Sequence, residues 1–132
     1  MRAWAKGSVR LIRQLMMATG ICLLAMILGL PVSALSQAAR EISGLLDFVE
    51  HSDCTFVRNG AEYPGSRARA HLEQKLNYLE SKNRVKSAED FIDLAATKSS
   101  LSGRAYEVRC PEGVQPAGIW LHQELQRQRE SK

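Results

Sequence analysis

The distribution of apolar residues divides the chain into a leader and a domain. Residues 15–30 form an uncharged apolar run, and residues 1–13 before it carry positive charges and no negative ones. A short segment of small residues ending at Ala34 follows the run. This order is typical of an export signal that is cleaved after its small residues. We therefore predict a signal peptide over residues 1–34 and a single domain over residues 35–132.

The predicted leader accounts for the basic character of the chain. It carries four of the 18 basic residues and none of the 14 acidic ones, so the 98 residues that follow are neutral overall. A neutral domain does not favour a nucleic-acid partner. Export predicts a periplasmic protein. The alternative is an uncleaved leader that anchors the chain in the membrane, although the run is shorter than the about 20 residues of a typical span.

The first half of the domain shows helical spacing, then a hairpin, then helical spacing again. Apolar residues over 38–49 predict an amphipathic helix. Asn59 and Gly60 separate two short extended segments and predict a β-hairpin, because both tolerate the positive φ angles of a two-residue turn. Ser66 is expected to cap a second helix that runs to about Leu79.

The second half predicts two more helices and one strand. Ser87 opens a third helix that should end near Lys98. Apolar and charged residues alternate over 106–110, which is typical of a strand, and residues 111–116 are expected to form a loop. A last helix begins at Ala117. The predicted architecture is a small single α+β domain, with about four helices packed on a short, mostly antiparallel sheet made of a hairpin and one strand.

Two of the three cysteines lie in the predicted domain. Cys22 belongs to the leader, which leaves Cys54 and Cys110 as an isolated pair. In an oxidising compartment such a pair is expected to form a disulfide, and the last strand must then lie beside the hairpin. Oxidised cysteine is neither a nucleophile nor a metal ligand, and His51 and Asp53 beside it match no common metal spacing. We predict no metal site and no cofactor.

Four ordered blocks of the chain resemble a known family. The blocks are Phe56-Val57-Arg58-Asn59-Gly60, His71-Leu72 with Lys75-Leu76, Ala88-Glu89-Asp90-Phe91-Ile92, and Ser99-Ser100-Leu101-Ser102-Gly103 with Tyr106 and Val108. Together they are similar to a family of short exported bacterial proteins of unknown function, the group that includes the enterobacterial protein YfeK. The resemblance implies export and a single domain. It supplies no catalytic residue.

Lys75 occupies an unusual position on the predicted second helix. At about 100° per residue it falls within the apolar stripe, and His71 lies one turn before it. One interpretation is a tie between helices, in which Lys75 pairs with Asp90 or Glu89 of the third helix. The other is that Lys75, His71 and Arg58 form a site for an anion or a carboxylate.

The serine-rich turn at residues 99–103 is a second candidate. Hydroxyls of Ser99, Ser100 and Ser102, together with nearby backbone amides, suit an anion, and local bonding within the turn is the alternative role. A catalytic serine would need His71 or another histidine as its base, and no nucleophile motif surrounds these serines.

The residues predict a function class rather than a named activity. The chain shows no recognisable catalytic set, so we expect a non-enzymatic exported module that binds a protein, peptide or envelope ligand. Its candidate site consists of Arg58, His71, Lys75 and the serine turn. Two alternatives stay open: a small periplasmic hydrolase or transferase that uses His71 with a serine of the turn, and an inhibitor or immunity protein.

Overall fold

The predicted hairpin forms part of a four-stranded sheet. The computed structural model describes residues 32–132. Its strands are β1 (Thr55–Arg58), β2 (Ala61–Pro64), β3 (Glu107–Cys110) and β4 (Gly113–Pro116). Asn59 and Gly60 connect β1 to β2 with φ angles of 51° and 80°, which confirms the predicted turn. All pairs are antiparallel and the strand order is β2-β1-β3-β4.

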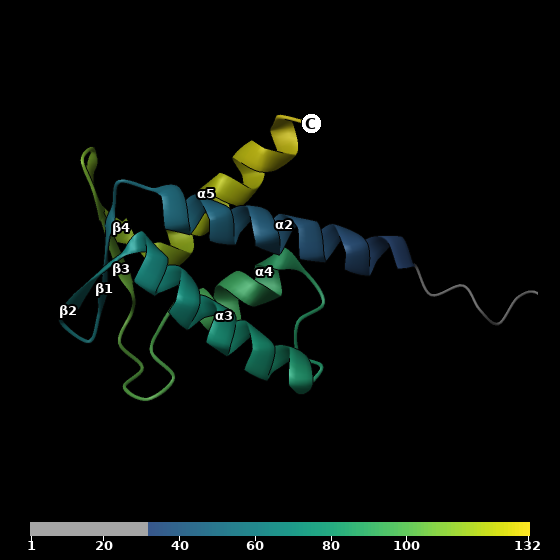
Figure 1. Ribbon diagram of the computed structural model, residues 1–132, viewed down its shortest axis with the longest axis horizontal. Helices are drawn as coiled ribbons and strands as arrows, with labels where there is room; N and C mark the ends of the chain where they lie inside the picture. Colours follow the sequence, from purple (N-terminus) through teal and green to yellow (C-terminus); the bar gives the residue numbers. More distant parts are fainter. Residues whose placement is uncertain (1–31) are drawn as a thin grey trace, which may run out of the picture. The chain divides into compact units, whose positions relative to one another are not determined.

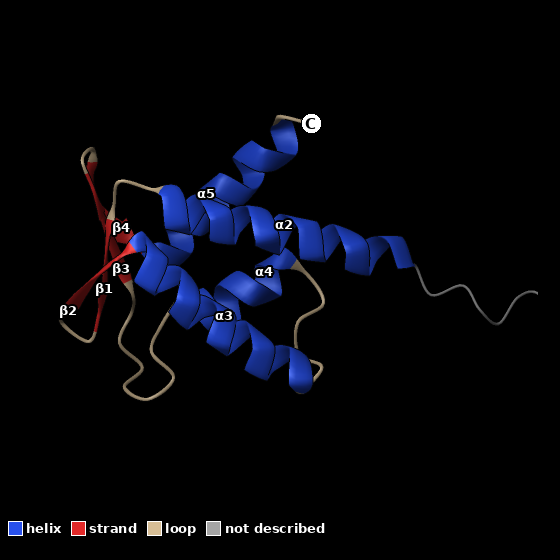
Figure 2. Ribbon diagram, viewed as in Figure 1, coloured by secondary structure: helices blue, strands red, loops and turns tan. Residues whose placement is uncertain are grey.

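Four helical segments cover one face of this sheet (Figures 1 and 2). They are α2 (Val32–His51), α3 (Gly65–Ser81), α4 (Ala88–Phe91) continued by the π-helix η1 (Ile92–Ala96), and α5 (Ala117–Glu130). Helices α3 and α5 contact the strands, and α2 packs across α3 and α5. The predicted α+β class, with four helices on a short antiparallel sheet, is confirmed.

The core lies between the helices and the covered face of the sheet. Its fully buried large side chains come from every layer: Leu45, Val49, Phe91, Ile92, Val108, Leu121 and Leu125. Trp120 joins the layers, because its ring packs 4.5 Å from Phe48 of α2 and 5.5 Å from Phe56 of β1. Aromatic pairs at these distances add stabilisation beyond the area they bury.

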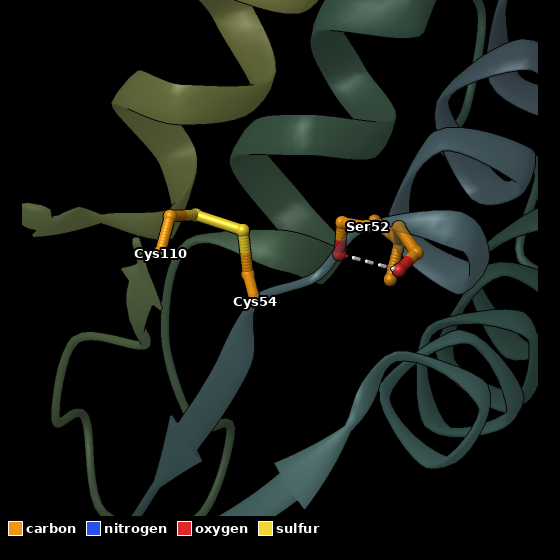
Figure 3. Close-up of a disulfide and its surroundings, with 4 residues drawn as sticks. Ser52, Cys54 and Cys110 are labelled. Carbon is orange, nitrogen blue, oxygen red and sulfur yellow. Dashed lines mark hydrogen bonds between the residues drawn. A yellow bond between two sulfur atoms is a disulfide. The ribbon is translucent and has the colours of Figure 1, made fainter. Parts of the chain in front are cut away.

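The disulfide joins the start of β1 to the end of β3. Cys54 and Cys110 are bonded, with their Cα atoms 4.2 Å apart (Figure 3). Strand β3 therefore lies beside the hairpin, as predicted. Next to Cys54, the hydroxyl of Ser52 donates to the carbonyl oxygen of Val49 at 2.9 Å, and this bond closes the end of α2.

Helix boundaries differ from the prediction at several points. Helix α2 begins at Val32, before the predicted cleavage position after Ala34, and the rest of the predicted leader lies outside the described residues. Ser66 does not cap α3, which begins one residue earlier because Gly65 packs against the backbone of α2. The Ser87 cap is confirmed, since its hydroxyl accepts from the Asp90 amide at 3.1 Å.

Two elements were predicted with the wrong type or extent. The third helix turns from α to π at Ile92, so its apolar positions no longer follow the 3.6-residue period. Residues 111–116 were expected as a loop, whereas β4 covers Gly113–Pro116. Glycine and proline at its two ends hide the strand pattern, and Pro116 fits there because β4 is an edge strand. None of the helices in the described part of the chain has the length and apolar character of a membrane span.

Candidate functional site

A pocket of about 230 Å³ opens between the sheet and the helices. Its floor is made of buried apolar side chains: Phe56, Leu72, Ala96, Ala117 and Leu121. Its mouth is polar and carries Arg58, Tyr63, Arg67, His71 and Gln74. Tyr106 lines the pocket between the two regions. The shape combines an apolar interior with a few polar groups, as ligand pockets usually do.

Local structure explains why these side chains meet. Arg58 lies two residues after Phe56 on β1, so both side chains point to the face covered by helices. His71 and Lys75 are four residues apart on α3 and share one helix face. Tyr106 precedes β3, and its amide donates to the Thr97 carbonyl oxygen at 2.9 Å. A strand, a helix and a loop thus converge on one point.

The polar side chains form a connected chain of hydrogen bonds. Arg58 Nη1 lies 2.7 Å from Nδ1 and 3.0 Å from Nε2 of the His71 ring. Nε2 of His71 lies 3.1 Å from the Tyr106 hydroxyl, and Lys75 Nζ donates to that hydroxyl at 3.4 Å. Lys75 also donates to the carbonyl oxygen of Lys98 at 2.9 Å. Arg58 Nη2 donates to the Tyr63 hydroxyl at 3.4 Å.

This chain contains more donors than acceptors. A neutral His71 fits best with Nδ1 accepting from Arg58 and Nε2–H donating to Tyr106. The Tyr106 oxygen then accepts from both His71 and Lys75, and its own O–H is directed elsewhere. Arginine has five N–H donors and lysine three, with no acceptor of their own. The arrangement therefore lacks an acceptor group that an anion would supply.

The electrostatics of the site agree with this count. Burial, together with the charges of Arg58 and Lys75, lowers the pKa of His71. Burial and the Arg58 charge also lower the pKa of Lys75. Burial raises the pKa of the Tyr106 hydroxyl, with Arg58 opposing it. Burial and the neighbouring positive charges thus disfavour the cationic forms of His71 and Lys75, and a bound negative charge would favour them.

The carboxylates that form ion pairs in the described part of the chain pair with cations outside the site. Their partners are Arg69, Arg109, His122, Arg127 and Arg129. No ion pair within residues 32–132 includes Arg58 or Lys75. The expectation that Lys75 pairs with Asp90 or Glu89 was wrong: Glu89 accepts from Arg129 at 2.6 Å, and Asp90 accepts from the Lys86 amide at 2.8 Å.

The serines of the 99–103 turn take part in local bonding. The Ser99 hydroxyl is buried and accepts from the amides of Leu101 and Ser102, each at 3.3 Å. The side chain of Asn59 donates to Ser99 at 3.3 Å and accepts from Ser102 at 2.5 Å. These bonds fasten the turn to the hairpin. Ser100 is exposed, and none of the hydrogen bonds in the described region joins His71 to a serine.

The prediction named Arg58 and His71, which line the pocket, and Lys75, which lies beside it and donates to Tyr106. It missed other lining residues, and the anion interpretation stays a prediction. Tyr63 and Tyr106 were not proposed as site residues, although Tyr63 pairs with the buried Phe56 across the hairpin and Tyr106 lies two positions before the buried Val108. The pocket floor gave no signal in the sequence, because apolar core residues and pocket residues follow the same pattern.

The other two histidines of the described region do not line this pocket. His122 Nε2 lies 2.8 Å from Asp93, and His51 Nδ1 lies 2.8 Å from the Asp47 carbonyl oxygen. Within residues 32–132, no group of three or more histidine, cysteine or acidic side chains is placed to hold a metal ion.

Comparison with known proteins identifies relatives of unknown function. The uncharacterized protein YfeK of Salmonella typhimurium strain LT2 is 39% identical over 85 residues, which cover 62% of this chain and 69% of the relative. No solved structure matches the chain. Residues 36–129 match the model of the family of unknown function DUF5329. The resemblance predicted from the four sequence blocks is confirmed, and the chain belongs to the DUF5329 family.

Proposed function

We propose that this protein is a non-enzymatic binding module whose ligand is an anion held in the pocket. The observation that carries the proposal is the excess of donors: Arg58 and Tyr106 line the pocket, Lys75 donates to the Tyr106 hydroxyl, and neither cation has a carboxylate partner among the described residues. Arginine and lysine that are partly buried normally pair with a carboxylate. A ligand that carries a negative charge would take that role.

Export of the protein is part of the proposal. Support comes from the basic and apolar pattern of residues 1–34 and from the disulfide, which is stable in oxidising compartments. An exported module of this kind would meet its ligand in the bacterial envelope, either as a free small molecule or as part of a peptide or protein.

The test is a titration of the oxidised protein with sodium acetate and with sodium phosphate at constant ionic strength. Two-dimensional NMR would follow the backbone amides of β1 and α3. We expect saturable shifts around Arg58 and His71 with at least one of the two anions. Because a hydrogen bond to a charged group contributes roughly 1.5–3 kcal/mol, Arg58→Gln should weaken binding by about tenfold or more.

Two further variants separate a binding role from a structural one. Lys75→Met keeps the length of the side chain and removes its charge, so it should abolish binding while stability falls by no more than about 1 kcal/mol. Arg84→Gln removes an exposed charge on the loop after α3 and should bind like the wild type. Wild-type affinity in Arg58→Gln and Lys75→Met would refute the proposal, as would the absence of saturable shifts with both anions.

A further inference from the structure

The floor of the pocket offers apolar surface beyond the reach of its cations. Phe56, Leu72, Ala96, Ala117 and Leu121 are each at most 9% exposed, and all of them line the cavity. An inorganic anion at the mouth would leave this surface in contact with water. An apolar group attached to the anion would cover it, which is favourable in proportion to the area removed from water. The pocket therefore suits a ligand with one charged end and one apolar end.

A π-helical segment contributes Ala96 to the pocket floor. The π-helix η1 ends at Ala96, and the hydroxyl of Thr97 donates to the carbonyl oxygen of Ile92 at 2.8 Å. Helix α5 approaches this turn closely at Gly118, where an added Cβ would lie 2.8 Å from Thr97 Oγ1. π-helical turns are rare and often occur at functional sites. The small side chain of Ala96 is thus fixed in place below the mouth.

The volume limits the size of the apolar group. The cavity measures about 230 Å³. For comparison, an apolar cavity of about 150 Å³ in another protein binds benzene. The floor therefore has room for roughly four to six carbon atoms, together with the charged group at the mouth.

The charged end is best matched by a carboxylate. The planar guanidinium of Arg58 suits two oxygens in one plane, and the Tyr106 hydroxyl adds a neutral donor. Arg58 and Arg67 line the mouth, Lys75 donates to the Tyr106 hydroxyl beside it, and the lowered pKa of His71 favours a neutral ring. The positive charge of the mouth suits an anion, and the planar guanidinium together with the apolar floor favours a carboxylate over an inorganic phosphate.

We infer that the pocket binds a monocarboxylate whose carboxylate meets Arg58, Lys75 and Tyr106 and whose apolar group fills the floor. The inference rests on the proposed function and adds the chemical class of the ligand. A short-chain fatty acid and the C-terminal residue of a peptide both present this chemistry, so the experiment includes both.

The first experiment is an affinity series with acetate, butanoate and hexanoate, followed by the same NMR signals. Each buried methylene is expected to tighten binding about fourfold, the ratio that corresponds to about 0.8 kcal/mol per CH₂. The gain should level off when the chain exceeds the pocket. Equal affinity for all three acids would overturn the inference and leave anion binding intact, whereas failure of acetate and phosphate to bind would refute the proposed function itself.

Two variants test where the apolar group of the ligand lies. Ala68 lines the pocket from α3, so Ala68→Leu should fill part of the floor. We expect loss of the gain from acetate to hexanoate. Ala39→Leu adds the same atoms at an exposed position on α2 and should keep the full gain. A full gain in Ala68→Leu would mean that the chain lies elsewhere and would overturn the inference.

The last comparison identifies the source of the carboxylate. A tetrapeptide that ends in valine is titrated with a free C-terminus and with an amidated one, beside pentanoate. Binding of the free peptide supports a peptide terminus as ligand, and binding of pentanoate alone supports a free fatty acid. Equal binding of the free and amidated peptides would show that no carboxylate is recognised and would overturn the inference.

Discussion

His71 lies beside Arg58 and Lys75, and this position determines how its charge responds to pH. Arg58 contacts the His71 ring directly, and Nε2 of the ring lies within hydrogen-bond distance of the Tyr106 hydroxyl. Lys75 donates to the same hydroxyl. Protonation of His71 would place a third positive charge in the site. Its pKa is accordingly lowered from the usual 6.5, with burial as the main cause. The free site thus favours the neutral ring.

A lowered histidine pKa makes stability depend on pH in a defined direction. Between the lowered value and 6.5, the unfolded chain binds more protons at His71 than the folded one. The free energy of unfolding should therefore fall as the pH drops below about 6.5. His71→Gln should remove this pH-dependent part of the free energy of unfolding. Urea unfolding at several pH values between about 5 and 8 measures it.

The control is His122→Gln, which removes an exposed imidazole paired with Asp93. It should keep the His71 component of the pH dependence. The carboxylates with lowered pKa values, Glu41, Glu89 and Glu124, lose their contribution at lower pH and act mainly outside this window. An unchanged slope in His71→Gln between about pH 5 and 6.5 would contradict the prediction.

For single residues, the sequence predicted which basic side chains come together but not which groups they bond to. The helical wheel placed Lys75 in an apolar stripe and His71 one turn away; His71 lines the pocket and Lys75 reaches the Tyr106 hydroxyl. A wheel gives the direction of a side chain from its own helix and nothing about the element opposite. Tyr106 comes from the loop before β3 and lies within hydrogen-bond distance of Lys75, so the predicted pairing of Lys75 with the third helix was wrong.

Among the elements, the junction of β2 and α3 depends on one glycine. A Cβ added to Gly65 would lie 2.4 Å from the carbonyl oxygen of Val49 and 2.8 Å from that of Glu50. Both contacts are with backbone at the end of α2, so no flexible side chain can give way. The close approach of α3 to α2, which orients His71 and Lys75, therefore requires glycine here.

Gly65→Ala is expected to force the two helices apart. Overpacking a well-packed contact costs about 1–3 kcal/mol, and we expect a loss of unfolding free energy in that range. Denaturant unfolding of the variant measures the loss. Ser66→Ala is the matched control, because Ser66 is exposed and makes no capping bond. Stability equal to wild type in Gly65→Ala would show that the junction tolerates a side chain.

The sequence predicted correctly those features that depend on interactions between neighbouring residues. The Asn59-Gly60 turn and the Ser87 cap depend on neighbouring backbone atoms, and both predictions were confirmed. The start of α3 depends on Val49, sixteen positions away, so Ser66 was assigned wrongly. The π turn at Ile92 follows from packing against α3 and α5, which the sequence of the third helix does not contain.

Across the whole molecule, one arginine ties three helices together. Arg129 near the end of α5 donates twice to Glu41 of α2, each time at 2.9 Å, and once to Glu89 of α4 at 2.6 Å. The Glu41 side chain is almost fully buried. The network joins α2, α4 and α5, while the disulfide joins the start of β1 to the end of β3. The pocket lies where the sheet meets the helices.

The disulfide should contribute a large share of the stability of so small a domain. Cys54 and Cys110 are 56 residues apart, and closing a loop of that length contributes about 4 kcal/mol on the chain-entropy model. A Cys54→Ala and Cys110→Ala double variant should therefore lose roughly 2–4 kcal/mol in denaturant unfolding, and reduced wild type should behave like it. Cys22→Ala, which changes the cysteine of the predicted leader, is the control.

In the envelope fraction, intact mass should show a chain beginning near Leu35 and lighter by two hydrogens than its reduced form, since export and oxidation are expected together. Free thiols at both Cys54 and Cys110 in that fraction would contradict this expectation.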